Sequence, residues 1–161
     1  MDVEKSMKET EAAFRLRGTI YYYIFDEARK ELGQEKAIAM FKRGVYRMGQ
    51  DIGQRFKKFA EAGDFKRLAE AFIGGVPCEG KLFDPKIEKA DEDGCVIKFS
   101  GCPLNEVWKD IGLSDEERDM ICDVAAALDF GTFESAGLDL EFNGRLAAGD
   151  ETCTLVVSKK K

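Results

Sequence analysis

Cys102 is the side chain best placed for chemistry, because it lies where a predicted strand gives way to a predicted helix. The segment Cys102-Pro103-Leu104 puts the thiol near helix-terminal N–H groups and the positive end of the helix dipole, which stabilise a thiolate and lower its pKa. We therefore expect Cys102 to be a nucleophile or a metal ligand. The alternative is a small buried residue at a helix entry, since free cysteine is among the most buried residue types.

Cys122 and Asp129 lie seven residues apart in a predicted helix over residues 114–136. That spacing is two helical turns, so both side chains project from one face and can point toward the predicted sheet. Alanines and a leucine surround Asp129, and such an apolar setting raises the pKa of a carboxyl group. The alternative for Asp129 is a structural role, paired with an arginine or capping a neighbouring loop.

Cys153 follows the sequence Gly149-Asp150-Glu151-Thr152, which predicts a turn and then a strand. Taken alone, this segment indicates a turn and a core cysteine. Cys102, Cys122 and Cys153 nevertheless each lie at an element end or on a predicted inner face, so they could converge, either as reactive thiols or as ligands of a metal such as zinc. None has the Cys-x-x-Cys spacing that is typical of zinc sites, so the cofactor stays undetermined.

Arg43 and Arg47 lie on a predicted second helix that also contains Gly44, Gly49 and Gly53. Interior glycines cost roughly 0.8–1 kcal/mol each relative to alanine, so they suggest close approach of another backbone or of a ligand. The alternative is tight helix–helix packing. The two arginines suit a solvated helix face, but they are also what a substrate carboxylate would need.

The chain of 161 residues contains no histidine. This absence excludes a Ser-His-Asp triad, a Cys-His pair and a histidine-based zinc site within one chain. Acid–base chemistry would have to use carboxylates, lysines, tyrosines or thiols whose surroundings move their pKa values toward neutrality. A transition-metal site would need Cys, Asp or Glu.

Hydrophobic periodicity predicts which elements position these groups. Apolar residues recur at three- and four-residue steps over about 6–32, 37–63 and 65–74, and they predict helices there. Alternation predicts strands at 86–90 and 95–99, and again at 138–142 and 153–157. Helices at 103–111 and 114–136 separate the two hairpins. Ser6 and Ser114 each stand three residues before a glutamate, which predicts capping boxes.

We therefore predict one α+β domain over residues 1–161, with a helical part at about 6–75 and an α+β part at about 78–158. An N-terminal helical hairpin precedes two β-hairpins, which form a four-stranded antiparallel sheet with helices on one face.

The composition narrows the classes of partner. A net charge of -6, from 25 Lys+Arg and 31 Asp+Glu, argues against a nucleic-acid role. No apolar run approaches the ~20 residues of a membrane span, and the polar start does not resemble a signal peptide. Five irregularly spaced cysteines indicate reduced thiols in a cytoplasmic protein. We expect a small-molecule ligand or substrate and no nucleic-acid or membrane partner. The sequence is compatible with a homo-oligomer as well as with a monomer.

These segments together resemble the L-2-amino-thiazoline-4-carboxylic acid hydrolase family, a label applied to bacterial and archaeal proteins. The resemblance spans about residues 14–158. It rests on Cys102-Pro103-Leu104, Trp108, Gly112-Leu113-Ser114, Cys122, Asp129 and the closing Gly149-Asp150 with Cys153, and more weakly on Lys36-Ala37 and Arg47-Met48-Gly49. The element order is also similar to that of 4-vinyl-reductase-type ligand-binding domains.

The first resemblance implies hydrolytic opening of a cyclic amidine toward a carbamoyl-cysteine. Cys102, Cys122 and Asp129 would be catalytic, with Asp129 relaying a proton, and Arg47 and Trp108 would contact the substrate. A thiolate at Cys102 would attack the ring carbon between sulfur and nitrogen, or a metal held by Cys102, Cys122 and Cys153 would activate water. The second resemblance implies a non-catalytic module that binds a small ligand or a metal.

Overall fold

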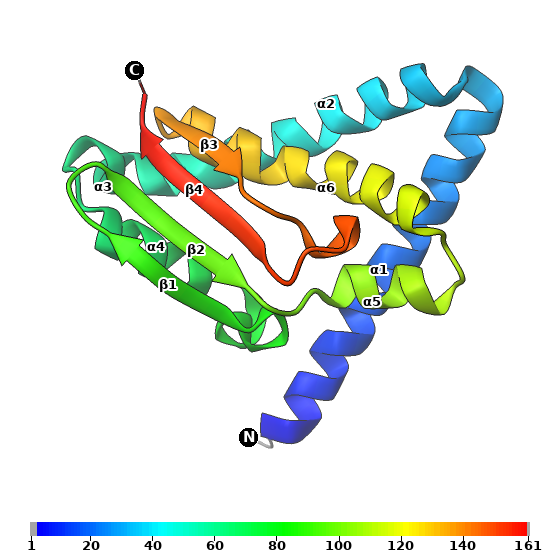
Figure 1. The fold of residues 1–161 in the computed structure, drawn as a ribbon, viewed down its shortest axis with the longest axis horizontal. Helices are drawn as coiled ribbons and strands as arrows, with labels where there is room; N and C mark the ends of the chain where they lie inside the picture. The colour runs from blue at the N-terminus through cyan, green and yellow to red at the C-terminus, as the bar shows by residue number, and fades with distance from the viewer. Residues whose placement is uncertain (1–2, 161) are drawn as a thin grey trace.

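The computed structural model describes residues 3–160, which form six α-helices and a four-stranded sheet (Figure 1). The helices are α1 (Val3–Leu32), α2 (Gln34–Gly53), α3 (Lys57–Glu61), α4 (Phe65–Gly74), α5 (Pro103–Asp110) and α6 (Asp115–Ser135). The strands are β1 (Pro85–Ala90), β2 (Gly94–Phe99), β3 (Leu138–Phe142) and β4 (Cys153–Lys159). Short 3-10 turns lie at Gln54–Phe56, Pro77–Phe83 and Leu146–Ala148. The predicted α+β class is confirmed.

The predicted N-terminal helical hairpin is formed by α1 and α2, which meet at Gly33 (Figure 1). Gly33 has a φ of 82°, a conformation that favours glycine and so allows the sharp reversal. The predicted capping box at Ser6 is wrong, because α1 already begins at Val3. Ser6 therefore lies inside the helix, where its carbonyl oxygen accepts the Thr10 hydroxyl at 2.8 Å.

The sheet is antiparallel throughout, with strand order β1-β2-β4-β3. The last strand of the chain, β4, therefore lies between β2 and β3. Phe99 of β2 stands opposite Cys153 of β4. This pairing brings the end of β2, just before Cys102, beside the start of β4. Both predicted hairpins are present, and the long-range pairing of β2 with β4 joins them into one sheet.

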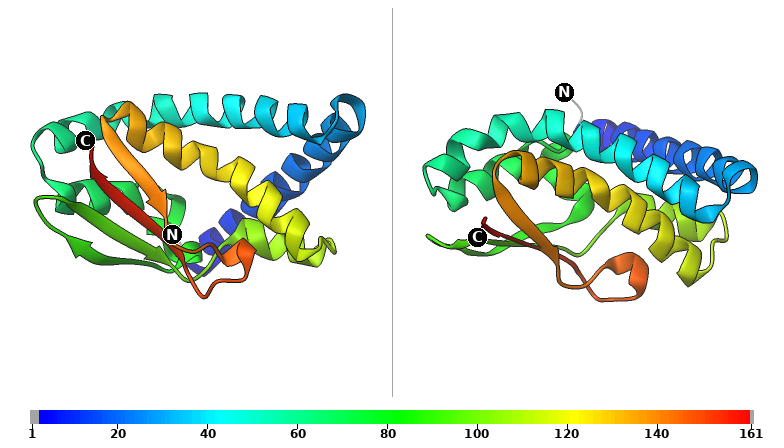
Figure 2. Two further views of the ribbon diagram at one scale, coloured as in Figure 1. Left: turned by 45° about the horizontal axis from the view of Figure 1, so that its top comes forward. Right: turned by 90° about the horizontal axis from the view of Figure 1, so that it is seen from above.

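One face of the sheet is buried against helices, as predicted. Figure 2 shows α2, α4 and α6 on the same side of the sheet. Phe56, Leu68 of α4 and Phe133 of α6 pack with the apolar residues of the strands. These strand residues, all less than a tenth exposed, are Cys95, Ile97, Leu138, Leu140, Leu155 and Val157.

Helices α2 and α6 pack with their backbones in close approach. A Cβ atom at Gly49 or Gly53 would overlap backbone atoms of Leu128 or Thr132, and one at Gly131 would overlap the Tyr46 carbonyl. Gly49 and Gly53 therefore serve helix–helix packing, which confirms that alternative for these two glycines. Gly44 differs, because nothing lies within 4 Å of its Cβ position.

A second apolar cluster holds α5 and α6 against the N-terminal hairpin. It includes Phe25 of α1, Ala37 of α2, Trp108 of α5 and Ile121 of α6. The predicted capping box at Ser114 is confirmed, since the Ser114 hydroxyl accepts the Glu117 N–H and the Glu117 carboxylate accepts the Ser114 N–H, both at 3.2 Å. None of the described helices is long and apolar enough to cross a membrane.

Candidate functional site

Cys102 lies in the connection between β2 and α5 and is the N-cap residue of α5. Pro103 occupies the first helical position, where its fixed φ favours the start of a helix. The Gly101 N–H donates to the Phe83 carbonyl oxygen at 3.0 Å, and the Glu106 N–H donates to the Cys102 carbonyl oxygen at 3.1 Å. These hydrogen bonds fix the backbone on both sides of the thiol.

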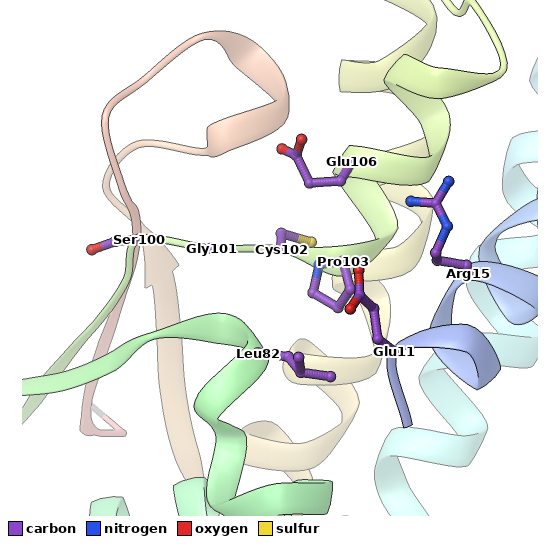
Figure 3. A pocket seen from close by; sticks show the side chains of 8 residues that line it. All are labelled: Glu11, Arg15, Leu82, Ser100, Gly101, Cys102, Pro103 and Glu106. Carbon is purple, nitrogen blue, oxygen red and sulfur yellow. The ribbon is translucent and has the colours of Figure 1, made fainter. Parts of the chain in front are cut away.

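A cleft of about 350 Å³ opens beside Cys102, between the first half of α1 and the start of α5 (Figure 3). Three charged side chains and the thiol are among its lining residues, which are Glu11, Arg15, Leu82, Ser100, Gly101, Cys102, Pro103 and Glu106. Figure 3 shows Glu11, Arg15 and Glu106 arrayed around the thiol. The cleft therefore offers both signs of charge next to a sulfur.

Two of the charged residues of the cleft, Arg15 and Glu106, pair with exposed side chains. An Arg15 Nη atom lies 2.6 Å from an Asp110 carboxylate oxygen, and the Lys109 ammonium lies 2.9 Å from a Glu106 carboxylate oxygen. Exposed ion pairs of this kind contribute about 0–1 kcal/mol, so a charged ligand can compete with them.

Burial is the dominant influence on the Cys102 thiol, and it raises the pKa. The backbone N–H groups of Asn105 and Leu104 and the charge of Arg17 lower the pKa, while Glu106 raises it. The expected net lowering of the Cys102 pKa is therefore wrong. The helix-terminal N–H groups are in place, but the loss of thiolate solvation outweighs them.

The other two cysteines singled out from the sequence lie within electrostatic reach of Cys102. Burial raises the pKa of Cys122 on α6 and of Cys153 on β4 to about 12. The three thiols also act on one another, since Cys102 raises the pKa of both, and Cys122 raises that of Cys153. The structure therefore places them in one region, at the meeting of α5, α6 and β4.

Asp129 belongs to the same region. Its carboxyl group raises the pKa of Cys122 and Cys153, so α6 directs Cys122 and Asp129 to the same side, toward β4. Burial raises the pKa of Asp129 to about 7. No cation or hydrogen-bond donor among residues 3–160 offsets this effect, whereas Asp119 and Asp123 of the same helix pair with Arg145.

Cys95 shows what distinguishes these thiols from a core cysteine. Burial raises the Cys95 pKa to about 12 as well, but its side chain is only 1% exposed. Cys102, Cys122 and Cys153 are partly exposed. They thus combine the desolvation of a core with some access to solvent, and of the three it is Cys102 that lines the cleft.

A metal site is not supported by this arrangement. Within residues 3–160, no group of three or more Cys, Asp or Glu side chains lies close enough together to hold a metal ion. Cys102, Cys122 and Cys153 influence one another electrostatically but do not converge on a common coordination point. The prediction of these residues as ligands of zinc therefore gains nothing from the structure.

Sequence reasoning missed three arginines near the cysteines. Arg15 lines the cleft, Arg17 acts on the Cys102 thiol, and Arg145 acts on the other two thiols. A glycine inside a long helix suggests that another segment approaches the helix closely at that point. Gly18 could therefore have pointed to its neighbours Arg15 and Arg17. No local signal marks Arg145, which reaches α6 from the connection between β3 and β4.

Two buried polar atoms near Cys102 and Arg17 lack hydrogen-bond partners in the described part of the chain. They are the Asn105 side-chain oxygen and the Tyr21 hydroxyl. Asn105 is only 2% exposed and lies in the first turn of α5, three residues after Cys102. Unpartnered buried polar groups are uncommon in folded proteins and are potential contacts for a ligand.

The family model described as L-2-amino-thiazoline-4-carboxylic acid hydrolase matches residues 13–157. The chain belongs to this family. The match includes Arg15, Arg17 and all of the cysteine and aspartate residues discussed above. No curated protein matches the chain in sequence.

Solved structures of two ligand-bound proteins have a fold similar to that of this chain. One is a trafficking protein particle complex subunit 3 from Naegleria fowleri covalently bound to palmitic acid, with a TM-score of 0.61, 15% identity, and coverage of 93% of this chain and 96% of that one. Another is the phenol-responsive sensory domain of the transcription activator PoxR with phenol, with a TM-score of 0.52, 15% identity, and coverage of 93% and 74%. At this identity the likeness concerns the fold.

The two substrate contacts that the family resemblance implied lie elsewhere. Arg47 is exposed on α2 and does not line the cleft, so it belongs to the solvated helix face that was its alternative. Trp108 is 1% exposed, and its indole N–H donates to the Gly18 carbonyl oxygen at 3.0 Å. Trp108 therefore anchors α5 to α1 inside the core.

Proposed function

We propose that this protein hydrolyses small cyclic amidines that carry a carboxylate, of the 2-amino-thiazoline-4-carboxylate type, with Cys102 as the nucleophile. The observation that carries the proposal is the position of the Cys102 thiol in a cleft that also contains one guanidinium and two carboxylates. A protonated amidine and a carboxylate on one small ring would find opposite charges there. The family match supports the same substrate class.

Each end of such a substrate has a complementary group in the cleft. Arg15 would bind the carboxylate, for which the guanidinium fork is suited. Glu11 and Glu106 would bind the amidine N–H groups. This assignment gives Arg15 the role that the sequence analysis gave to Arg47.

The reaction would proceed through a covalent intermediate on Cys102. The thiolate attacks the ring carbon between sulfur and nitrogen, the ring carbon–sulfur bond breaks, and the ring sulfur leaves as a thiolate that takes up a proton. Water then attacks the same carbon, and the Cys102 thiolate leaves. The product is the carbamoyl derivative of cysteine, which contains the atoms of the substrate plus one water.

Asp129 would accept and return the protons in this sequence. A group with a pKa of about 7 can both take up and release a proton near neutral pH. Cys102 and Asp129 both act on the pKa of Cys122, so we assign Cys122 to the same catalytic group.

Turnover of 2-amino-thiazoline-4-carboxylate by the purified protein tests the proposal, with mass spectrometry following the product that is heavier by one water. We expect Cys102→Ser to reduce turnover by roughly a hundredfold or more, since it removes the nucleophile. Cys78→Ser is the matched control, because Cys78 is also a free cysteine but lies outside the cleft. Full turnover by Cys102→Ser would refute the role of Cys102.

The second candidate is a binding module without catalysis. It is favoured by the two similar solved structures, one bound to palmitic acid and the other with phenol, and by the raised pKa of Cys102, which keeps the thiol neutral. It predicts that the thiazoline binds equally to the wild type and to Cys102→Ser, in calorimetry, without any product. Product formation that depends on Cys102 would exclude it.

A further inference from the structure

We propose that the outward face of the α1–α2 hairpin is a self-association surface, on which α1 of each chain packs against α2 of a second copy. This inference goes beyond the proposed function and does not depend on it. It rests on apolar side chains, charges and one glycine that the rest of the described chain does not cover.

The exposed apolar side chains of the protein are concentrated on this hairpin. All of the large apolar side chains within residues 3–160 that are at least 40% exposed belong to α1 or α2. The right-hand view of Figure 2 shows these two helices together on the side of the molecule away from the sheet. Four of the side chains recur at three- and four-residue steps and form one stripe along α1: Leu16, Ile20, Tyr23 and Ile24. Such a contiguous exposed apolar surface is typical of an interaction site.

The outward face of α2 differs from that of α1, because it is basic. Lys36, Met40, Arg43 and Arg47 follow one another at the same helical steps, and all four are exposed. Neither Arg43 nor Arg47 takes part in an ion pair between described residues. Arginine is enriched at protein interfaces, where its aliphatic stem covers apolar surface while its guanidinium group stays available for hydrogen bonds.

The charges on the two helices favour a second copy as the occupant of this face. Glu27 and Glu31 continue the stripe of α1 toward the turn, and Lys36 begins the outward face of α2 just after it. Glu31 and Lys36 take no part in ion pairs between described residues. The glutamates would repel an anionic membrane from the apolar stripe, whereas a second copy presents cations to them and glutamates to the cations.

The spacing of these residues allows both contacts at once. Glu31 and Lys36 are two and three residues from Gly33, where the helices meet, and Ile24 and Arg43 are nine and ten residues from it. Because both helices rise equally per residue, a two-fold axis along the bisector of the hairpin brings each pair together between copies. The contact is isologous and closes at two chains.

Gly44 indicates where the two copies approach most closely. It lies opposite Tyr23 of the second copy in the same register, eleven and ten residues from Gly33. A glycine inside a helix lowers helix stability, and no described atom within 4 Å of a Cβ at Gly44 requires one there. The exposed ring of Tyr23 from the second copy would occupy this open space.

Sedimentation velocity of the purified full chain over a range of concentrations tests the inference. We expect a reversible equilibrium between the monomer of 18.0 kDa and a dimer. In Ile20→Asp the dissociation constant of the dimer should rise roughly tenfold or more, because a carboxylate would be buried among apolar groups. Val3→Asp is the matched control and should dimerise like the wild type. Val3 is also an exposed apolar residue of α1, but it lies beyond the reach of α2 in this register.

Charge reversal tests the pairing of α1 with α2. Glu31→Lys and Lys36→Glu should each raise the dissociation constant roughly two- to fivefold, and the double variant should regain most of the wild-type affinity, because opposite charges again face each other. Gly44→Gln separates association from folding. It should leave the monomer at least as stable, since glutamine favours a helix, and yet weaken the dimer by filling the space for Tyr23.

The results that would overturn the inference are distinct. A wild type that stays monomeric at every concentration would overturn it, and binding of that monomer to phosphatidylserine vesicles would assign the face to a membrane instead. A dimer that Ile20→Asp leaves intact, or a double charge reversal no tighter than the single ones, would also overturn it. No turnover is measured, so the outcome is independent of whether the thiazoline is hydrolysed.

Discussion

At the scale of single residues, the thiols and the carboxyl group of the candidate site share one property: burial disfavours their charged forms. Cys102, Cys122, Cys153 and Asp129 all have raised pKa values because protein surrounds them, and yet all four keep some exposure. In a protein without histidine, a carboxyl group with a pKa of about 7 takes the place that an imidazole often has in acid–base chemistry.

Asp129 should therefore make folding stability dependent on pH. Its folded-state pKa is raised, so its contribution is fully present below about pH 4 and is lost as the pH rises through about 7. The loss from this group is at most about 4 kcal/mol. Asp129→Asn should be more stable than the wild type at pH 8 and should show a flatter profile in urea unfolding between pH 4 and 8.

The control for this measurement is Asp51→Asn, a substitution of an exposed carboxylate on α2. It should leave the pH dependence of unfolding unchanged. If Asp129→Asn retains the wild-type slope, Asp129 is ionised in the folded protein at neutral pH and cannot act as the proposed proton carrier.

At the scale of elements, the contact between α2 and α6 decides where Cys122 and Asp129 are directed. Gly49 and Gly53 let the two backbones approach, and this approach fixes the rotation of α6 over the sheet. Gly49→Ala should destabilise the protein by about 3 kcal/mol or more, because its methyl group would overlap the Leu128 carbonyl oxygen. Thermal or urea unfolding measures the effect.

Gly44→Ala provides the opposite case on the same helix. Nothing lies within 4 Å of its Cβ position, so only helix propensity changes, and a gain of about 0.5–1 kcal/mol is expected. Equal effects of the two substitutions would show that α2 and α6 are not in backbone contact.

The sequence predicted the helices and strands better than it predicted how they pack together and which side chains that packing buries. The spacing of Cys122 and Asp129 correctly placed them on one face of α6, and alternation around Cys95 and Leu155 correctly predicted strands and their buried face. The order of the strands was not predictable from local periodicity, because the pairing of β2 with β4 joins segments about sixty residues apart in sequence. The pKa of Cys102 was predicted in the wrong direction for a related reason, since its burial depends on α1, α6 and β4.

At the scale of the whole molecule, the helical part and the α+β part share their cores. Trp108 of α5 bonds to Gly18 of α1, and α2 packs along α6, so the first and last thirds of the chain are in contact. The sequence-based prediction of one domain therefore leads to a prediction for unfolding.

We expect the chain to unfold in one cooperative transition. Trp108 is the single tryptophan, so its fluorescence reports on the contact between α1 and α5, while far-ultraviolet circular dichroism reports on all of the helices. Midpoints in urea from the two signals should coincide. Separate midpoints would indicate two folding units and would contradict the single-domain prediction.

The most direct test of the central claim is the rate at which the purified protein converts 2-amino-thiazoline-4-carboxylate to the carbamoyl derivative of cysteine, compared between the wild type, Cys102→Ser and Cys78→Ser. Our account predicts that the wild type and Cys78→Ser form product at similar rates, while Cys102→Ser forms almost none. Product formed equally well by all three, or by none of them, would contradict it.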